Sequence, residues 1–225
     1  MHAKAGFFLL IFILCNVLPC FAVDGLGVAA RGGITAYRIE NDRTAETWRL
    51  FEGAGKGTGS GSPVINTHGS HVAFWRRDER GDIRHSYISI VRADISIDHP
   101  DWEKKDLFDI EFIYNWVNDV LVDERQQAYI TEISWPQGDW IWYGHNHNRD
   151  IWRVNVQTGE RQHVATLQYK MLQLMFGGLN GEVYVHGSGK EEAFDNRAMY
   201  AMPDPASSSI PVDIPHTRSN MTGGG

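Results

Sequence analysis

Cysteine is nearly absent from this chain of 225 residues. Its two copies, Cys15 and Cys20, both lie within the first twenty positions. Disulfide bonds therefore cannot hold the rest of the chain together, and its stability must come from apolar burial and strand pairing. With 42% hydrophobic and 22% charged residues, the composition indicates a folded globular protein and not a disordered one.

Long runs of one charge sign are also missing. The formal net charge is −7, and the lysines and arginines are scattered along the sequence. A nucleic-acid-binding surface would need clustered cations that displace counterions from phosphates. We therefore exclude nucleic acid as a partner.

Long hydrophobic runs are missing everywhere except near the N-terminus. There a short positive region, 1–4, precedes an apolar run at 6–18 that is too short to cross a bilayer comfortably. Cys20-Phe21-Ala22 follows and matches a secretory cleavage site placed before Val23. We predict a signal peptide at 1–22, a mature domain at 23–225 that is secreted or periplasmic, and no membrane span after cleavage.

Two other interpretations of the leader are less favoured. An uncleaved membrane anchor would need a longer apolar run. Lipid attachment at Cys20 would need a small residue where Pro19 stands.

Internal repeats are the main feature that is present. Three segments share a turn that contains glycine, followed by an alternating apolar strand, and the glycines are Gly69, Gly138 and Gly181. A polar residue precedes each glycine, which is typical of a tight hairpin turn with a positive backbone angle. The strands after the turns are rich in aromatic and β-branched residues, which favour β-structure.

Two further elements recur after each turn. The first is an apolar alternation that leads into a polar turn, and aligning Tyr37, Ile88, Trp152 and Tyr200 gives offsets of 51, 64 and 48 residues. The second is a closing strand, seen at 47–51, 163–167 and 210–214. Each repeat therefore has the outline of a small antiparallel sheet, with the spacing of propeller blades. The earliest copy, at 32–51, lacks a glycine turn upstream.

The stretch 102–135 is ambiguous. It could hold a short helix, but we interpret it as strands that end one blade and begin the next.

The segment from Trp135 to Glu160 resembles the repeats of TolB-like β-propellers. It reads "W-P-x-G-x-x-I-x-Y … D-I-W-R-V-N-V-x-T-G-E", and 65–75 looks like the same motif. The resemblance covers roughly 32–214 and implies an all-β fold, a β-propeller of antiparallel four-stranded blades. There is room for about four blades, whereas TolB-like members are expected to have six or more. The array is therefore incomplete or open, or the chain is a piece of a longer protein, which is the favoured alternative.

The aromatic strand 140–143 has two interpretations. Alternation places Trp140 and Trp142 on one face and Ile141 and Tyr143 on the other. Stacked sheets need bulky side chains on both faces, so a structural role is favoured. The alternative is that the tryptophans are exposed and stack on sugar rings or on a peptide.

Other chemical signals are weak. His145 and His147 have the spacing of two ligands on one strand face, with Asp150 nearby, but Gly144, Asn146 and Asn148 indicate a hairpin loop whose polar residues meet water. We therefore expect no metal.

Carboxylates and loop motifs are interpreted in the same way. A group of acidic residues could contain a glycosidase-like pair, but a solvated surface is favoured. Its members are Asp106, Asp109, Glu111, Asp119, Asp123 and Glu124. "GAGKGT" at 53–58 and "GSGKEE" at 187–192 both fail as phosphate loops, and 53–63 is predicted to be a flexible loop between blades. Asn220 begins a formal glycosylation sequon.

These observations favour a non-catalytic scaffold that binds a protein or an extracellular ligand. We assign no catalytic and no metal-ligating residue, leave the binding residues unassigned, and expect no cofactor. The alternative is an enzyme context, as a carbohydrate-active propeller or as the propeller part of a secreted peptidase. The scaffold role is a fold-level analogy and not an argument from a site.

Overall fold

The computed structural model describes most of the chain beyond the leader. The described residues are 25–30, 32–53, 59–80, 83–112, 114–115, 120–121, 130–145, 150–167, 171–177, 181–190, 193–202 and 212–214. The predicted signal peptide lies outside these ranges. No helix long and apolar enough to cross a bilayer occurs within them.

Every regular element in the described ranges is a β-strand, and the strands form antiparallel sheets in chain order. The first sheet has three strands, β1 (Gly25–Ala30), β2 (Gly33–Glu40) and β3 (Arg43–Glu52). The second has four, β4 (Gly59–Ile65), β5 (His71–Arg80), β6 (Ile83–Arg92) and β7 (Lys104–Phe112). The third contains β10 (Ile130–Ser134), β11 (Trp140–His145), β12 (Asp150–Asn155) and β13 (Arg161–Thr166). The fourth contains β14 (Met171–Gly177), β15 (Val183–Lys190), β16 (Ala193–Ala201) and β17 (Val212–Ile214).

The predicted glycine turns are confirmed. Gly69, Gly138 and Gly181 all have positive φ angles, of 68°, 62° and 89°. Each lies between the first and second strands of a four-stranded sheet. The three glycines therefore occupy equivalent corners of successive sheets. A positive φ angle is adopted easily only by a residue without a Cβ, which explains why each corner holds a glycine.

Where the structure describes the ambiguous stretch between the second and third sheets, its regular elements are strands, and 113, 116–119 and 122–129 lie outside the described residues. Within 102–135, β7 closes the second sheet and β10 opens the third. A small two-stranded sheet, β8 (Tyr114–Asn115) with β9 (Val120–Leu121), lies between them in the chain.

Consecutive sheets stack face to face through three apolar clusters. Ile34 and Leu50 of the first sheet meet Phe74 of the second. Side chains on the other face of the second sheet, such as Ile88, join the third sheet, and a last cluster joins the third sheet to the fourth. Both faces of a middle sheet are thus buried, which gives the protein its core without disulfides.

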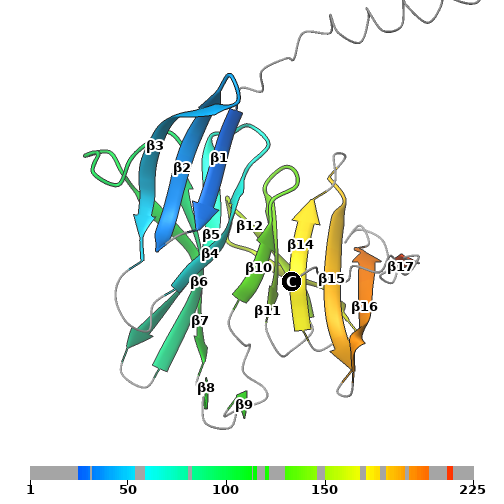
Figure 1. The fold of residues 1–225 in the computed structure, drawn as a ribbon. Coiled ribbons are helices and arrows are strands. Elements are labelled where there is room, and N and C mark those ends of the chain that lie inside the picture. Colours follow the sequence, from blue (N-terminus) through cyan, green and yellow to red (C-terminus); the bar gives the residue numbers. More distant parts are fainter. Residues whose placement is uncertain are drawn as a thin grey trace, which may run out of the picture.

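The array is a partial β-propeller of about four blades. The first strands of neighbouring sheets lie beside one another, β1 with β4, β4 with β10, and β10 with β14. Figure 1 shows the sheets following one another from the blue first sheet to the yellow and orange fourth. Among the described residues, no core cluster joins the first sheet to the fourth.

Among the described residues the first sheet has three strands, one fewer than the other blades, and the copy at 32–51 is the one that lacks a glycine turn upstream. β1 precedes the copy at 32–51 and pairs with β2, and no repeat pattern in the sequence indicated it. Gly32, with a φ of 63°, lies in the connection between these two strands.

The prediction of a flexible loop over 53–63 is wrong for its second half. Residues from Gly59 onward form β4, which pairs with β5. Gly61 is placed opposite Trp75, and a Cβ at Gly61 would lie 2.5 Å from the Trp75 ring. The glycines of this segment therefore make room for a large aromatic side chain and do not signal flexibility. Residues 54–58 lie outside the described ranges.

Candidate functional site

The turns of the second and third sheets gather at one end of the molecule, which we call the turn face. In each sheet the residue that follows the third strand donates its backbone N–H to the residue just before the second strand. The bonds are Ala93 N to Ser70 O, 2.9 Å, and Val156 N to Asp139 O, 2.8 Å. The same bond in both sheets places their connections at equivalent positions on the turn face.

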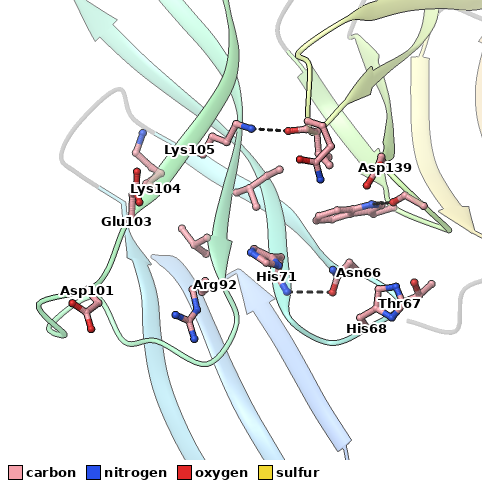
Figure 2. A pocket seen from close by; sticks show the side chains of 16 residues that line it. Asn66, Thr67, His68, His71, Arg92, Asp101, Glu103, Lys104, Lys105 and Asp139 are labelled. Atoms are coloured by element: carbon pink, nitrogen blue, oxygen red, sulfur yellow. Dashed lines mark hydrogen bonds between the residues drawn. The ribbon is translucent and has the colours of Figure 1, made fainter.

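A groove opens on the turn face between the second and third sheets, with a volume of about 810 Å³. Both sheets contribute to its lining, as Figure 2 shows. Its lining residues are Asn66, Thr67, His68, His71, Ile90, Val91, Arg92, Asp101, Glu103, Lys104, Lys105, Trp135, Gly138, Asp139, Val156 and Gln157. A volume of this size falls in the range of ligand-binding cavities.

One wall of the groove is the β4–β5 turn, which Asn66 holds in shape. The Asn66 Oδ1 accepts hydrogen bonds from the backbone N–H groups of Ser70, at 2.9 Å, and His71, at 3.2 Å. The Asn66 Nδ2 donates to the Ser70 hydroxyl at 3.0 Å, and that hydroxyl lies 2.9 Å from His71 Nδ1. This is a side chain that closes a turn, so its polar groups fix the wall of the groove.

Trp135 fixes the opposite wall. Its indole N–H donates to the carbonyl of Gly138 at 2.8 Å, and its ring is 8% exposed within the core of the third sheet. The tryptophan therefore closes the turn that carries Gly138 and Asp139 beside the groove.

Each cation in the lining is engaged by the protein itself. Arg92 donates two hydrogen bonds to Asp94, at 3.1 and 2.7 Å. Lys104 pairs with Asp106, at 2.5 Å. Lys105 donates from Nζ to the carbonyl of Val156 at 2.7 Å, which links β7 to the third sheet.

The carboxylates of the lining differ from its cations in their ion pairing. Among the described residues, Glu103 and Asp139 form no ion pair. Asp101 lies 3.8 Å from His99 Nδ1, and its charge also acts on Arg92. Figure 2 shows Asp101 and Glu103 on one side of the groove and Asp139 on the other.

A second groove of about 690 Å³ lies between the first and second sheets. Gly69, in the turn that walls the first groove, belongs to its lining, together with Trp48, Ala93 and Glu40. The arrangement is thus repeated from one pair of sheets to the next on the turn face.

An ionic network that the sequence did not reveal lies on the second sheet. Arg76 is 7% exposed, stacks over the Tyr87 ring with 3.7 Å between the guanidinium carbon and the ring centroid, and pairs with both Asp78 and Asp106. Burial opposes the charge of Asp106, but hydrogen bonds from Arg76, Lys104 and Ser89 outweigh it and hold the pKa of Asp106 below its ordinary value.

The pKa of the Glu132 carboxyl is shifted in the opposite direction to that of Asp106. Burial raises the pKa of Glu132 from 4.5 to about 7, although a hydrogen bond with Ser62 acts in the other direction. The Ser62 Oγ lies 3.2 Å from each of three groups, Trp75 Nε1, Thr131 O and Glu132 Oε2. One hydroxyl can satisfy all three only if it accepts from Trp75 and from a protonated Glu132 and donates to Thr131. The geometry therefore suits a neutral Glu132 at the contact of β4 with β10.

Both tryptophans of β11 pack against other side chains of the protein. Trp142 is 6% exposed and belongs to the cluster between the third and fourth sheets, while Ile141 and Tyr143 face the second sheet. The predicted alternation is thus confirmed. Trp140 is half-buried, and Arg153 covers its ring at 4.1 Å, so one of its faces is not free for a sugar.

The predicted loop environment of His145 is wrong. His145 ends β11, is 1% exposed and meets the Tyr143 ring edge-on. Asp150 accepts a hydrogen bond from the Thr166 hydroxyl and lies 3.1 Å from His163 Nε2. Within the described ranges no group of three or more potential ligands could hold a metal, and His147 lies outside them.

The acidic residues of the sequence analysis separate into different environments. Asp106 belongs to the Arg76 network and Asp109 lies 2.9 Å from His85 Nδ1, while both residues are also exposed to solvent. Glu111 lies on β7. The remaining candidates, Asp119, Asp123, Glu124 and Asn220, lie outside the described residues.

Comparisons with known proteins support the fold. No protein-family model matches the sequence, and no curated protein matches it. A chain of a solved nidogen–laminin complex, which contains a β-propeller, matches 80% of this chain with a TM-score of 0.53 and 13% identity. A protein of Bacteroides uniformis that is provisionally assigned as a 6-phosphogluconolactonase matches 86% of this chain with a TM-score of 0.39 and 12% identity. The chain spans 57% and 54% of the lengths of these two chains, and the first match shows a β-propeller-like fold alone.

Proposed function

We propose that the chain is a secreted or periplasmic, non-catalytic β-propeller scaffold that binds another protein or an extracellular ligand on its turn face. The observation that carries the proposal is the groove of about 810 Å³ between the second and third sheets. Rigid stacked sheets hold its walls, and a pre-formed cavity on a rigid scaffold is the usual setting of a binding site.

A closer relation to TolB-like propellers is part of the same proposal. The "W-P-Q-G" turn supports it, because Trp135 closes this turn through Gly138, whose φ is 62°. The tryptophan of the motif is thus needed for the hydrogen bond that closes the turn, and the glycine for the positive φ angle at its corner.

Export is the remaining part of the proposal. It is supported by the leader pattern at 1–22. Mass spectrometry of the exported chain is expected to give Val23 as the first residue. Export with 1–22 still attached would contradict cleavage.

The glycan alternative has lost its main support. It requires tryptophan rings that are free to stack, whereas Trp142 is buried and Arg153 covers a face of Trp140. A binding surface on the turn face does not depend on these two rings.

A matched pair of substitutions tests the binding role. Ligands would first be selected on the purified chain from a random-peptide display library and a glycan array. Thr67→Trp places a bulky ring at an exposed position of the groove, whereas Thr44→Trp does so at an exposed position of β3 that lines neither groove. Thr67→Trp is expected to reduce affinity for the selected ligand at least tenfold, with Thr44→Trp unchanged. Equal loss or no loss in both variants would contradict a binding site in the groove.

A further inference from the structure

Two irregular strand positions meet where β4 of the second sheet touches β10 of the third, and we call this contact the inner joint. The pairing of β4 with β5 is irregular around Ser62, and that of β10 with β11 is irregular around Thr131. Such bulges redirect side chains, and here the Ser62 hydroxyl lies 3.2 Å from Thr131 O and 3.2 Å from Glu132 Oε2. The inner joint is therefore a polar contact between two sheets that otherwise pack through apolar side chains.

The backbone of Ser62 is strained. Its φ angle is 45°, in the left-handed region that residues with a Cβ rarely adopt. Strain of this kind persists only where surrounding contacts hold the residue. For Ser62 these contacts include the hydroxyl's interactions with β10 and the hydrogen bond that it accepts from the Trp75 indole N–H at 3.2 Å.

The proton of Glu132 decides whether the inner joint is satisfied. The Ser62 hydroxyl has a single proton, which is free for the Thr131 carbonyl only when a protonated Glu132 donates to Ser62. An ionised Glu132 is an acceptor only, so the two acceptors then compete for the same proton. Loss of the Glu132 proton therefore leaves one of them without this donor.

Charged groups on the surrounding strands do not replace that proton. The strands packed against β10 are β4, β5, β6, β11 and β14, and β4 and β14 contain no titratable residue. On the other three strands, the titratable and charged residues with described side chains on the faces between the second and third sheets are His71, Arg77, Arg84, Arg92, Tyr143 and His145. None of these groups contributes to the pKa shift of Glu132, which burial causes and the Ser62 hydrogen bond opposes. An ionised Glu132 thus has no cation to stabilise it in place.

We propose that Ser62 and Glu132 form a proton-controlled joint between the second and third sheets, closed when Glu132 is protonated and released when Glu132 is ionised. On ionisation the carboxylate turns toward water, and Ser62 loses its contact with the Glu132 side chain. Because burial raises the pKa of Glu132 from 4.5 to about 7, the joint is closed at acid pH and opens as pH rises through 7. Closure does not require a ligand in the groove on the turn face.

Nuclear magnetic resonance of the full chain follows the proton and the contact together. The ¹³Cδ shift of Glu132 reports its ionisation, and the nuclear Overhauser effect between the side-chain protons of Ser62 and Glu132 reports their contact. The Overhauser effect is expected to weaken about threefold or more between pH 5.5 and pH 8.5, with the same midpoint as the ¹³C titration. Both signals come from the folded state, so release of the joint is distinguished from unfolding.

Two substitutions assign the effect to Glu132. Glu132→Gln keeps a donor for Ser62 at every pH, and it is expected to retain the contact at both ends of the range. Glu103→Gln is the matched control, since it removes an exposed carboxylate that lies before β7 and outside the inner joint. It is expected to leave the titration of the contact as in the wild type.

The other outcomes overturn the proposal. A constant Overhauser effect while the ¹³C shift titrates would show that Glu132 ionises in place without releasing Ser62. A titration that is complete below pH 5.5 would remove the protonated state on which closure depends. Equal weakening in Glu132→Gln would assign the change to another group. The wild-type titration decides the first two points without any variant.

Discussion

The indole N–H of Trp48, on β3, donates a hydrogen bond of 2.9 Å to the carbonyl of Ala93 in the second sheet. Trp102 makes the reverse connection, because its indole N–H donates to Leu50 of the first sheet at 2.8 Å. Trp48 and Trp102 therefore join the first sheet to the second, each with its ring against the apolar cluster between them and its N–H on a carbonyl. For these two tryptophans the structural role needs no ligand.

Trp48→Phe is expected to destabilise the protein by about 1 to 2 kcal/mol, because the Ala93 carbonyl loses its donor. Trp152→Phe is the matched control. The Trp152 indole N–H is buried without a hydrogen-bond partner among the described residues, so its removal relieves an unfavourable group. Urea denaturation of both variants measures the difference. A larger loss in Trp152→Phe than in Trp48→Phe would contradict the role given to the Trp48 bond.

Gly61→Ala is expected to cost about 2 kcal/mol or more. Its new Cβ would meet the Trp75 ring at 2.5 Å, and the ring is held by its bond to Ser62. Gly25→Ala introduces the same methyl group where no atom lies within 4 Å, and it is expected to change stability by less than about 0.5 kcal/mol. Equal thermal midpoints for the two variants would show that Gly61 is not required for the packing of Trp75.

Glu132 is expected to make stability depend on pH. The pKa of Glu132 is about 7 in the folded protein, above its ordinary value of 4.5. The folded state therefore holds the proton more tightly, and its stabilisation is complete below pH 4.5 and is lost as pH rises through 7. Relative to Glu132→Gln, the wild type should lose about 1 to 2 kcal/mol of stability over this window, because solvent partly screens the cost of burying the charge.

The measurement is the free energy of unfolding of both proteins from pH 4 to pH 8. The glutamine variant serves as the control for all other titrating groups, including the histidines. A difference that stays constant over the range, or that changes in the wild type's favour as pH rises, would contradict a neutral Glu132.

Arg76 and Asp106 are expected to be energetically coupled. Arg76→Met leaves Asp106 and Asp78 without their buried partner and should cost about 3 kcal/mol. Asp106→Asn should cost less, and the double variant should cost about 1 to 3 kcal/mol less than the sum of the two. Because the pKa of Asp106 is lowered in the fold, the coupling should be present at neutral pH and fade as pH falls below about 4. Additive effects at pH 7 would refute the coupling.

The sequence predicted the fold where local chemistry determines the backbone. Gly69, Gly138 and Gly181 need positive φ angles, and the alternation in β11 divides Trp142 from Tyr143, so both features could be found from a single segment. The segment "GSGSP" looked like a loop because its requirement for glycine arises from Trp75, a residue of the neighbouring strand.

The candidate site could not be found in the same way. The groove exists only because the second and third sheets stack, and its residues come from turns far apart in the chain. The pairing of Arg76 with Asp106 likewise depends on strand register, with Ser89 opposite Asp106. A spacing pattern in the sequence carries no information on which charges are already paired.

The stacking of the second and third sheets is the claim on which the fold and the groove both depend. Methyl-labelled isoleucine offers the most direct measurement, because Ile88 and Ile90 on β6 and Ile130 and Ile133 on β10 belong to one buried cluster. We predict nuclear Overhauser cross-peaks between the methyl groups of the two pairs, and their loss in urea. A folded protein with no cross-peak between β6 and β10 isoleucines would contradict the stacked arrangement and the groove that it forms.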